Sequence, residues 1–119
     1  MLSSKATRAP YAMLSLYTTS KFALDGLLRC LPREFPGLQV SRVVVGNTIG
    51  TDFSSGWDPE VLGAAVERWE ADGLLDDMGL LEVSQVAAAV LFALGSSAFI
   101  DEIAVMDTRP QGEDLADQA

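Results

Sequence analysis

Apolar residues along the chain recur in two patterns, one typical of helices and one typical of buried strands. From about residue 14 to residue 31 they return every three or four positions, which predicts a helix with one apolar face. The residues on that face are Phe22, Leu24, Leu27, Leu28 and Leu31. A second stretch, 84–94, also has helical spacing, with Ser84 as the expected N-cap. Residues 38–45 instead end in three consecutive valines, and such a run is typical of a parallel strand buried on both faces.

Cap and turn residues divide the remaining chain. The Asp-Pro-Glu sequence at 58–60 predicts a helix start, because aspartate caps a helix, proline fits its first position and an acid there complements the helix dipole. This helix is expected to end near Gly73, which suits a C-cap position. Residues 2–4 have the pattern of a strand end, and 100–106 are expected to form a final strand. The order strand, helix, strand, helix, helix, strand predicts an α/β fold with right-handed crossovers.

Composition and charge narrow the class of protein. With 119 residues, 49% hydrophobic and 21% charged, the chain is expected to form one globular domain. Eight Lys and Arg residues stand against 17 Asp and Glu, a net charge of −9, so neither nucleic acid nor an anionic membrane is an expected partner. No apolar run is long enough to span a bilayer and the N-terminus lacks the pattern of a signal peptide, so a cytoplasmic location is expected.

Histidine and cysteine usage excludes several kinds of site. The chain has no histidine, which rules out a Ser-His-Asp or Cys-His nucleophilic site and a histidine zinc site within it. No metal site is predicted. The single cysteine, Cys30, cannot form an intrachain disulfide and, within the first predicted helix, is expected to be a small core residue.

The candidate chemistry lies near the start of the first predicted helix, in the sequence Tyr-Thr-Thr-Ser-Lys. Four positions apart on a helix, Tyr17 and Lys21 share one face. A free tyrosine has a pKa of about 10, and an adjacent ammonium lowers that pKa because it favours the phenolate. The pair is therefore a plausible general acid/base unit. A half-buried tyrosine beside a solvated lysine, without chemistry, is the alternative that this spacing leaves open.

Two further features accompany that pair. Ser4 stands thirteen positions before Tyr17, at the end of the first predicted strand, and the valine-rich strand is followed by Gly-Asn-Thr-Ile-Gly-Thr-Asp-Phe at 46–53. A serine, then Tyr-x-x-x-Lys, then a strand and a turn with Thr-Asp-Phe, in this order, resembles the short-chain dehydrogenase/reductase family. The resemblance runs from residue 3 to about 105. It implies a partial Rossmann-type fold, a doubly wound parallel sheet of which this chain holds only the C-terminal half.

The resemblance also implies roles for five residues. In that family a serine, a tyrosine and a lysine are catalytic, and they correspond here to Ser4, Tyr17 and Lys21. The serine binds the substrate oxygen, the tyrosine exchanges a proton with it, and the lysine tunes the tyrosine and binds the nicotinamide ribose. The expected contacts of an NAD or NADP cofactor are Tyr17, Lys21, Ile49 and Thr51. The implied function is NAD(P)-dependent hydride transfer to or from a small-molecule carbonyl or alcohol, and a homo-oligomer is implied as well.

The chain departs from the family pattern in two places. Gly46 and Asn47 stand where the family has a Pro-Gly pair, so the fixed φ of proline is lost, although asparagine can adopt the left-handed conformation of glycine. Neither Gly-x-Gly-x-x-Gly nor Gly-x-x-x-Gly-x-Gly, the phosphate-binding motifs, occurs. We therefore expect residues 1–107 to form the C-terminal half of such a domain and 108–119 to be an acidic, flexible tail. Dinucleotide binding by this chain alone is expected to be weak or absent.

Three hypotheses about function remain open at this point. The first is an oxidoreductase of short-chain type, of which this chain is a fragment that carries the catalytic residues. The second is a non-catalytic remnant that acts as an interaction or oligomerisation module through an exposed strand edge or an apolar helix. The third is an unrelated small α/β domain in which Tyr17 and Lys21 are structural.

Overall fold

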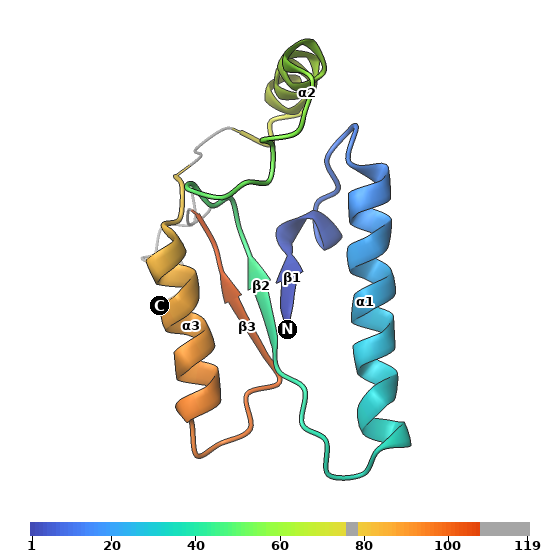
Figure 1. Cartoon of the computed structure of the whole chain (residues 1–119), viewed down its shortest axis with the longest axis vertical. Coiled ribbons are helices and arrows are strands. Elements are labelled where there is room, and N and C mark those ends of the chain that lie inside the picture. The colour runs from blue at the N-terminus through green and yellow to red at the C-terminus, as the bar shows by residue number, and fades with distance from the viewer. Residues whose placement is uncertain (76–78, 108–119) are drawn as a thin grey trace, which may run out of the picture.

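Three short parallel strands form the centre of the molecule (Figure 1). The computed structural model describes residues 1–75 and 79–107, so the predicted acidic tail, 108–119, lies outside the described residues. The strands, paired in the order β1-β2-β3, are β1 (Leu2–Ser4), β2 (Arg42–Val45) and β3 (Glu102–Val105). The helices are α1 (Ser15–Glu34), α2 (Pro59–Ala71) and α3 (Val83–Gly95), with a short 3-10 helix, η1, at Lys5–Thr7. The predicted α/β fold with a parallel sheet is confirmed.

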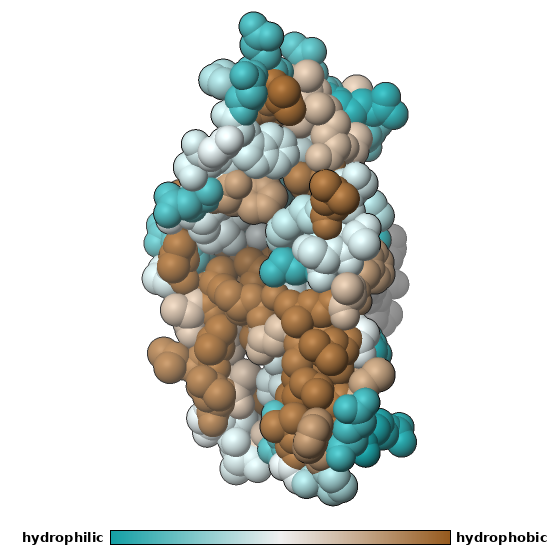
Figure 2. Space-filling view, turned by 45° about the vertical axis from the view of Figure 1, so that its right-hand side comes forward, coloured by the Kyte–Doolittle hydropathy of each residue, from teal (hydrophilic) through white to brown (hydrophobic). Residues whose placement is uncertain are grey.

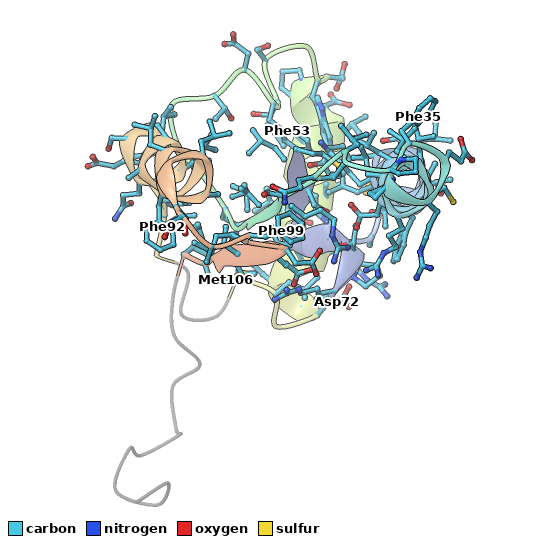
Figure 3. The ribbon with its side chains drawn as sticks, turned by 90° about the horizontal axis from the view of Figure 1, so that it is seen from below. Phe35, Phe53, Asp72, Phe92, Phe99 and Met106 are labelled. Atoms are coloured by element: carbon cyan, nitrogen blue, oxygen red, sulfur yellow. The ribbon has the colours of Figure 1, made fainter. Side chains whose placement is uncertain are left out.

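Helices α1 and α3 lie on opposite sides of this sheet, and α2 lies beyond the carboxyl ends of its strands (Figure 1 and Figure 3). The strand register places Ser3, Val44 and Ala104 side by side on one face. The Ser3 hydroxyl donates to the Asp25 carboxylate of α1 at 3.2 Å, so this is the face that α1 covers. The strands pair in sequential order while the two helices lie on opposite faces, so the two crossovers have opposite hands. The prediction that both are right-handed is wrong.

The helix limits follow from their capping residues. Asp58 caps α2 as predicted, since its carboxylate accepts from two backbone N–H groups of the first turn at 2.8 and 3.3 Å. In α3 the N-cap is Glu82 rather than Ser84, because the Gln85 side chain accepts from the Glu82 N–H at 2.8 Å and closes a capping box. Pro32 does not end α1, since it lies in the last turn, where only one helical hydrogen bond is lost. Within the described ranges, none of these helices is both long and apolar enough to span a membrane.

The buried core is small for a chain of this length. Among the described residues, the buried apolar side chains are Ala6, Tyr11, Leu14, Val43, Val44, Ala65, Leu81 and Ala89. The adjacent Val43 and Val44 point to opposite faces of the sheet, so the prediction that β2 is buried on both faces is confirmed. The strand itself begins at Arg42, four residues later than its sequence pattern predicts.

Much apolar surface stays exposed, including parts of α1 and α3. Phe22 and Leu27, both on the predicted apolar face of α1, are 51% and 54% exposed. Cys30 is exposed as well, so the prediction that it is a core residue is wrong. On α3, Leu91 and Leu94 are also exposed. Figure 2 shows apolar side chains gathered into two ridges with a trough between them, in the part of the molecule below α2.

Candidate active site

A cleft of about 800 Å³ opens at the carboxyl ends of β1 and β2. Four of the five residues predicted from the sequence line it, namely Ser4, Tyr17, Lys21 and Thr51. Ile49 lies outside the lining, 47% exposed, where its N–H donates to the Leu81 carbonyl at 2.9 Å. The fold thus brings the three predicted catalytic residues into one cleft, while their roles stay predictions.

Ser4 is the last residue of β1 and is half-buried. Its hydroxyl oxygen accepts a hydrogen bond from the Ala6 N–H at 3.2 Å and thereby caps η1. The Thr7 hydroxyl donates to the Ser4 carbonyl at 2.8 Å, which fixes the same turn. Within the described residues the Ser4 hydroxyl acts only as an acceptor, so its own proton remains free for a ligand in the cleft.

Tyr17 lies in the first turn of α1, and Lys21 follows one turn later on the same face. The Lys21 ammonium is 5.7 Å from the centre of the Tyr17 ring and donates to the Leu2 carbonyl at 3.3 Å. The Tyr17 ring also meets Phe53 edge to face, with the ring centroids 5.0 Å apart. In the described part of the chain the Tyr17 carbonyl accepts from the Ser20 hydroxyl, but its phenol hydroxyl has no hydrogen-bond partner. That hydroxyl is therefore free to bind a ligand.

A second tyrosine and a second lysine lie at the same edge of the sheet. Lys5 forms a salt bridge with Asp107, whose two carboxylate oxygens are each 3.1 Å from the ammonium, and it lies 5.8 Å from the Tyr11 ring centre. The Asn47 side-chain amide donates to Asp107 at 3.1 Å, and the Tyr11 hydroxyl makes a long hydrogen bond, 3.5 Å, to the Asn47 side-chain oxygen. We term Lys5, Tyr11, Asn47 and Asp107 the edge network, since they join segments that follow all three strands.

Burial and pairing act in opposite directions on the pKa of Lys5. Desolvation alone would lower the pKa of its ammonium, but the interactions with Tyr11 and Asp107 outweigh it and raise that pKa above the ordinary value of 10.5. The Asp107 side chain is only 5% exposed. Near neutral pH, Lys5 is therefore a fixed cation that neutralises a buried carboxylate.

The edge network explains why the turn after β2 lacks the Pro-Gly pair. A Cβ at Gly46 would lie 2.5 Å from an Asp107 carboxylate oxygen and 2.9 Å from the Asp107 backbone nitrogen, so a proline would be obstructed there as well. Asn47 follows with the side-chain amide that Asp107 accepts. The backbone reason expected for Asn47 does not hold, because among the described non-glycine residues only Met13 has a positive φ, 64°. The side chain, not the backbone conformation, accounts for asparagine at this position.

Comparison with known proteins agrees with this architecture. No protein-family model and no curated protein matches the chain. The solved structure of a small-chain dehydrogenase in complex with NADPH matches 89% of the chain, with a TM-score of 0.64 and 21% identity. The fold is short-chain dehydrogenase-like. The chain spans 48% of that protein's chain, about half its length, and the predicted partial Rossmann-type fold is confirmed.

Sequence reasoning missed the edge network and the place of Phe53 in the lining of the cleft. Lys5 and Asp107 are 102 positions apart, so no local spacing connects them. The signal in the sequence was the unusual Gly46-Asn47 turn, because an asparagine at this place indicates that its side chain has a hydrogen-bond partner. Trp57 both packs against the buried cluster of Ala6, Tyr11 and Leu14 and lines the cleft.

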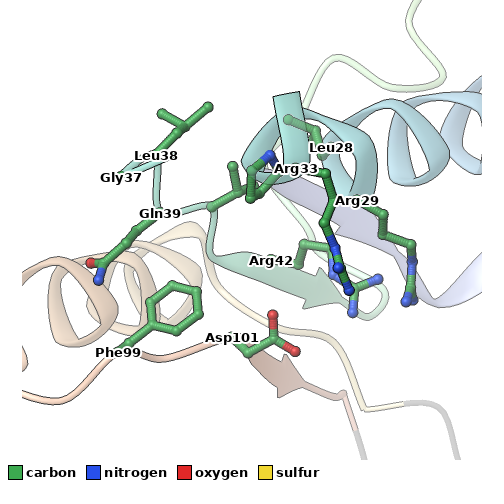
Figure 4. Close-up of a pocket in the computed structure, with 11 residues that line it drawn as sticks. Leu28, Arg29, Arg33, Gly37, Leu38, Gln39, Arg42, Phe99 and Asp101 are labelled. Carbon is green, nitrogen blue, oxygen red and sulfur yellow. The ribbon is translucent and has the colours of Figure 1, made fainter. Parts of the chain in front are cut away.

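A second cavity, of about 700 Å³, lies at the opposite, amino end of the strands (Figure 4). Arg29, Arg33 and Arg42 line it together with Asp101. Arg42 is buried and forms a salt bridge with Glu102 at 2.7 Å, so its charge is neutralised within the chain. This cavity contains none of the predicted site residues. The cleft at the carboxyl edge is therefore the candidate active site.

Proposed function

We propose that this chain carries the proton-transfer site of an NAD(P)-dependent oxidoreductase of short-chain type, which acts on a small-molecule carbonyl or alcohol. The observation that carries the proposal is the meeting of Ser4, Tyr17 and Lys21 in one cleft at the carboxyl edge of a parallel sheet. That edge is where open α/β sheets bind their ligands. The similar solved structure is a dehydrogenase that holds NADPH, which supports the same chemistry here.

Two hydroxyl groups can reach the substrate oxygen. In the reduction direction, Tyr17 donates its proton to the carbonyl oxygen as that oxygen becomes a hydroxyl, and in oxidation it takes the proton back. Ser4 stabilises the negative charge that develops on the same oxygen, because its hydroxyl accepts from Ala6 and keeps its own proton for donation. Lys21, anchored by the Leu2 carbonyl, places a positive charge beside the Tyr17 ring.

We propose that the cleft takes the nicotinamide end of the cofactor rather than the whole dinucleotide. A reduced nicotinamide, when bound, supplies the hydride. Lys21 and Thr51 line the cleft and would hold the nicotinamide end, with Tyr17 beside it, whereas the contact predicted for Ile49 has no counterpart in the lining. The sequence has no glycine-rich phosphate motif, so we propose that a second half-domain holds the pyrophosphate and adenine.

The free edge of the sheet supports such a half-domain. In the described sheet β1 pairs only with β2, and Leu2 of β1 is 47% exposed. An unpaired strand edge beside apolar surface is a template for another strand. The match to about half of a dehydrogenase chain is in line with this proposal.

Hydride transfer by the purified chain tests the proposal. The chain is mixed with a ketone and an excess of NADPH, NADH or reduced nicotinamide mononucleotide, and cofactor oxidation is followed by absorbance. We expect slow oxidation that Tyr17→Phe abolishes, at similar rates for the mononucleotide and the dinucleotides. If wild type and Tyr17→Phe oxidise the cofactor equally fast, the oxidoreductase proposal is wrong. Micromolar affinity of the chain for NADPH would contradict the need for a second half-domain.

A non-catalytic interaction module is the second candidate function, and the exposed apolar side chains favour it. Leu16 of α1 is 87% exposed, and Leu91 and Leu94 of α3 are 69% and 76% exposed. Covering apolar surface stabilises an assembly by about 25 cal/mol per Å². This candidate predicts that the chain elutes as an oligomer in size-exclusion chromatography and that Leu91→Glu reduces its size. A folded monomer would contradict it.

A further inference from the structure

Five aromatic rings form a continuous wall along the cleft that contains Tyr17. The neighbouring pairs are Tyr11–Trp69, Trp69–Trp57, Trp57–Phe53 and Phe53–Tyr17, with ring centroids 5.4, 6.3, 6.0 and 5.0 Å apart. All five side chains line the cleft. They come from the loop before α1, from α1, from the loop before α2 and from α2 itself. The fold, not any local motif, therefore builds this aromatic wall.

One end of the aromatic wall is anchored by contacts within the chain. The Trp69 indole N–H donates to the Ala12 carbonyl at 2.7 Å, and Tyr11 is only 7% exposed. At the other end the wall finishes on Tyr17, the proposed proton donor, next to Phe53. A flat ligand that packs on Phe53 and Trp57 therefore lies beside the Tyr17 hydroxyl.

The charged residues of the lining disfavour an anionic ligand. Lys5 is neutralised by Asp107 at 3.1 Å, and Lys21 is engaged with the Leu2 carbonyl and the Tyr17 ring. Asp52 lines the same cleft as an exposed carboxylate. Because Asp107 neutralises Lys5, and Asp52 offsets the charge of Lys21, the lining has no surplus positive charge to attract a carboxylate or phosphate.

We infer that the cleft selects a neutral aryl or fused-ring ketone, or the corresponding secondary alcohol, and binds its rings along the aromatic wall. Aromatic rings attract one another in edge-to-face and offset arrangements at centroid distances of about 4.5–7 Å, the range that the rings of the wall already show among themselves. The volume, about 800 Å³, lies within the range of roughly 300–1,000 Å³ typical of small-molecule sites. The identification as a ketone or alcohol rests on the proposed function, whereas the ring preference rests on the wall alone.

Calorimetric titration of the full chain with three ketones tests the selection. The probes are acetylnaphthalene, its carboxylate analogue acetylnaphthoate, and cyclohexanone. We expect acetylnaphthalene to bind at least about tenfold more tightly than either of the others, because it alone combines fused rings with zero charge. Equal affinity for cyclohexanone, or tighter binding of acetylnaphthoate, would overturn the inference.

A matched pair of variants separates the wall from general hydrophobicity. Phe53 and Phe92 are both partly exposed, at 48% and 60%, but only Phe53 lines the cleft, and Figure 3 shows Phe92 beside α3, away from Phe53. Phe53→Ala should weaken acetylnaphthalene binding about tenfold, and Phe92→Ala should change it less than about twofold. Similar losses in the two variants would contradict a site on the wall.

Tyr17→Phe distinguishes a failure of this inference from a failure of the proposed function. The variant keeps the ring of Tyr17 in contact with Phe53, so acetylnaphthalene affinity should stay within about threefold while reduction stops. Ring-selective binding without any Tyr17-dependent reduction would contradict the oxidoreductase and leave the aromatic preference standing. If reduction depends on Tyr17 but cyclohexanone and acetylnaphthalene bind with equal affinity, the aromatic preference is contradicted and the oxidoreductase proposal stands.

Discussion

The molecule contains two tyrosine–lysine pairs at the same edge of the sheet, and they differ in what holds their polar groups. The ammonium lies 5.7 Å from the ring centre in the Tyr17–Lys21 pair and 5.8 Å in the Tyr11–Lys5 pair. The Tyr11 hydroxyl donates to Asn47, whereas the Tyr17 hydroxyl has no partner in the described part of the chain. Lys5 is paired with a buried carboxylate, whereas Lys21, among the residues described, donates only to a backbone carbonyl. The two pairs share their residue types and the distance from ring centre to ammonium. They differ in the hydrogen-bond partners of the hydroxyl and the ammonium, and that difference separates the proposed catalytic pair from the structural one.

The largest expected difference between the two pairs concerns their hydroxyl groups. Tyr17→Phe should lower the hydride-transfer rate by about 100-fold or more, because it removes the proposed proton donor. Its free energy of unfolding should change by less than about 0.5 kcal/mol, since the hydroxyl lost is unbonded in the described residues.

Tyr11→Phe is the matched control, since the same atom is removed from the same cleft. It should lower the free energy of unfolding by about 1 kcal/mol, because Asn47 loses its donor, and keep most of the hydride-transfer rate. Rates and urea denaturation of both variants check this. Equal losses of rate would mean that the free hydroxyl of Tyr17 is not special.

Removing the two lysines should reverse the order of the effects on stability. Lys5→Met leaves the Asp107 carboxylate buried without its cation, so the free energy of unfolding should fall by about 3 kcal/mol. Lys21→Met removes a single hydrogen bond to a backbone carbonyl, so the loss should be about 1 kcal/mol or less. Urea denaturation monitored by tryptophan fluorescence measures both. A smaller loss for Lys5→Met than for Lys21→Met would refute the structural role of the edge network.

The same contrast explains what the sequence could predict. Tyr17 and Lys21 could be predicted as a pair because a helix brings positions four apart onto one face. Ser4 was predicted from the family resemblance, by its spacing from Tyr17 at the end of a strand. The Lys5–Asp107 contact could not be predicted, since it depends on how strands at the two ends of the chain pair with β2. Local patterns specify elements, whereas contacts between elements depend on sheet order and on the side of the sheet that each helix occupies.

Burial on the helices shows a similar limit. The three- and four-residue repeat correctly predicted α1, but Phe22 and Leu27 stay exposed because no described element covers that part of the helix. Periodicity reports which face of a helix is apolar, but it does not report whether this chain itself supplies the cover. The N-cap of α3 was predicted at Ser84 but lies at Glu82. An acidic residue with a glutamine three positions later can form a capping box, as a serine with a glutamate does.

The tight turn that carries Asn47 gives a smaller but well-controlled effect. Gly46→Ala would place a Cβ 2.5 Å from an Asp107 carboxylate oxygen, so the free energy of unfolding should fall by about 2 kcal/mol. Gly26→Ala is the control, because Gly26 lies inside α1 with nothing within 4 Å of the added Cβ. It should stabilise the chain by about 0.5–1 kcal/mol. Thermal denaturation of both variants gives the comparison, and a neutral Gly46→Ala would mean that Asp107 does not approach the turn this closely.

The smallest expected effect is a dependence of stability on alkaline pH that arises from Lys5 and Asp107. The pKa of Lys5 is higher in the folded chain than its ordinary value of 10.5, so its contribution to stability is fully present below that pH. The contribution is lost as the pH rises through the folded-state pKa, because the proton that pairs with Asp107 leaves.

The difference in unfolding free energy between wild type and Lys5→Met should therefore be constant up to about pH 10 and shrink at higher pH. Lys5→Arg, whose charge persists over this range, should show no such decline relative to Lys5→Met. Urea denaturation at a series of pH values measures all three proteins, and subtraction removes the titration of the tyrosines. A difference that stays constant through the alkaline range would mean that Asp107 does not hold the Lys5 proton. The Lys5–Tyr11 pair would then be no more firmly held than the pair formed by Lys21 and Tyr17.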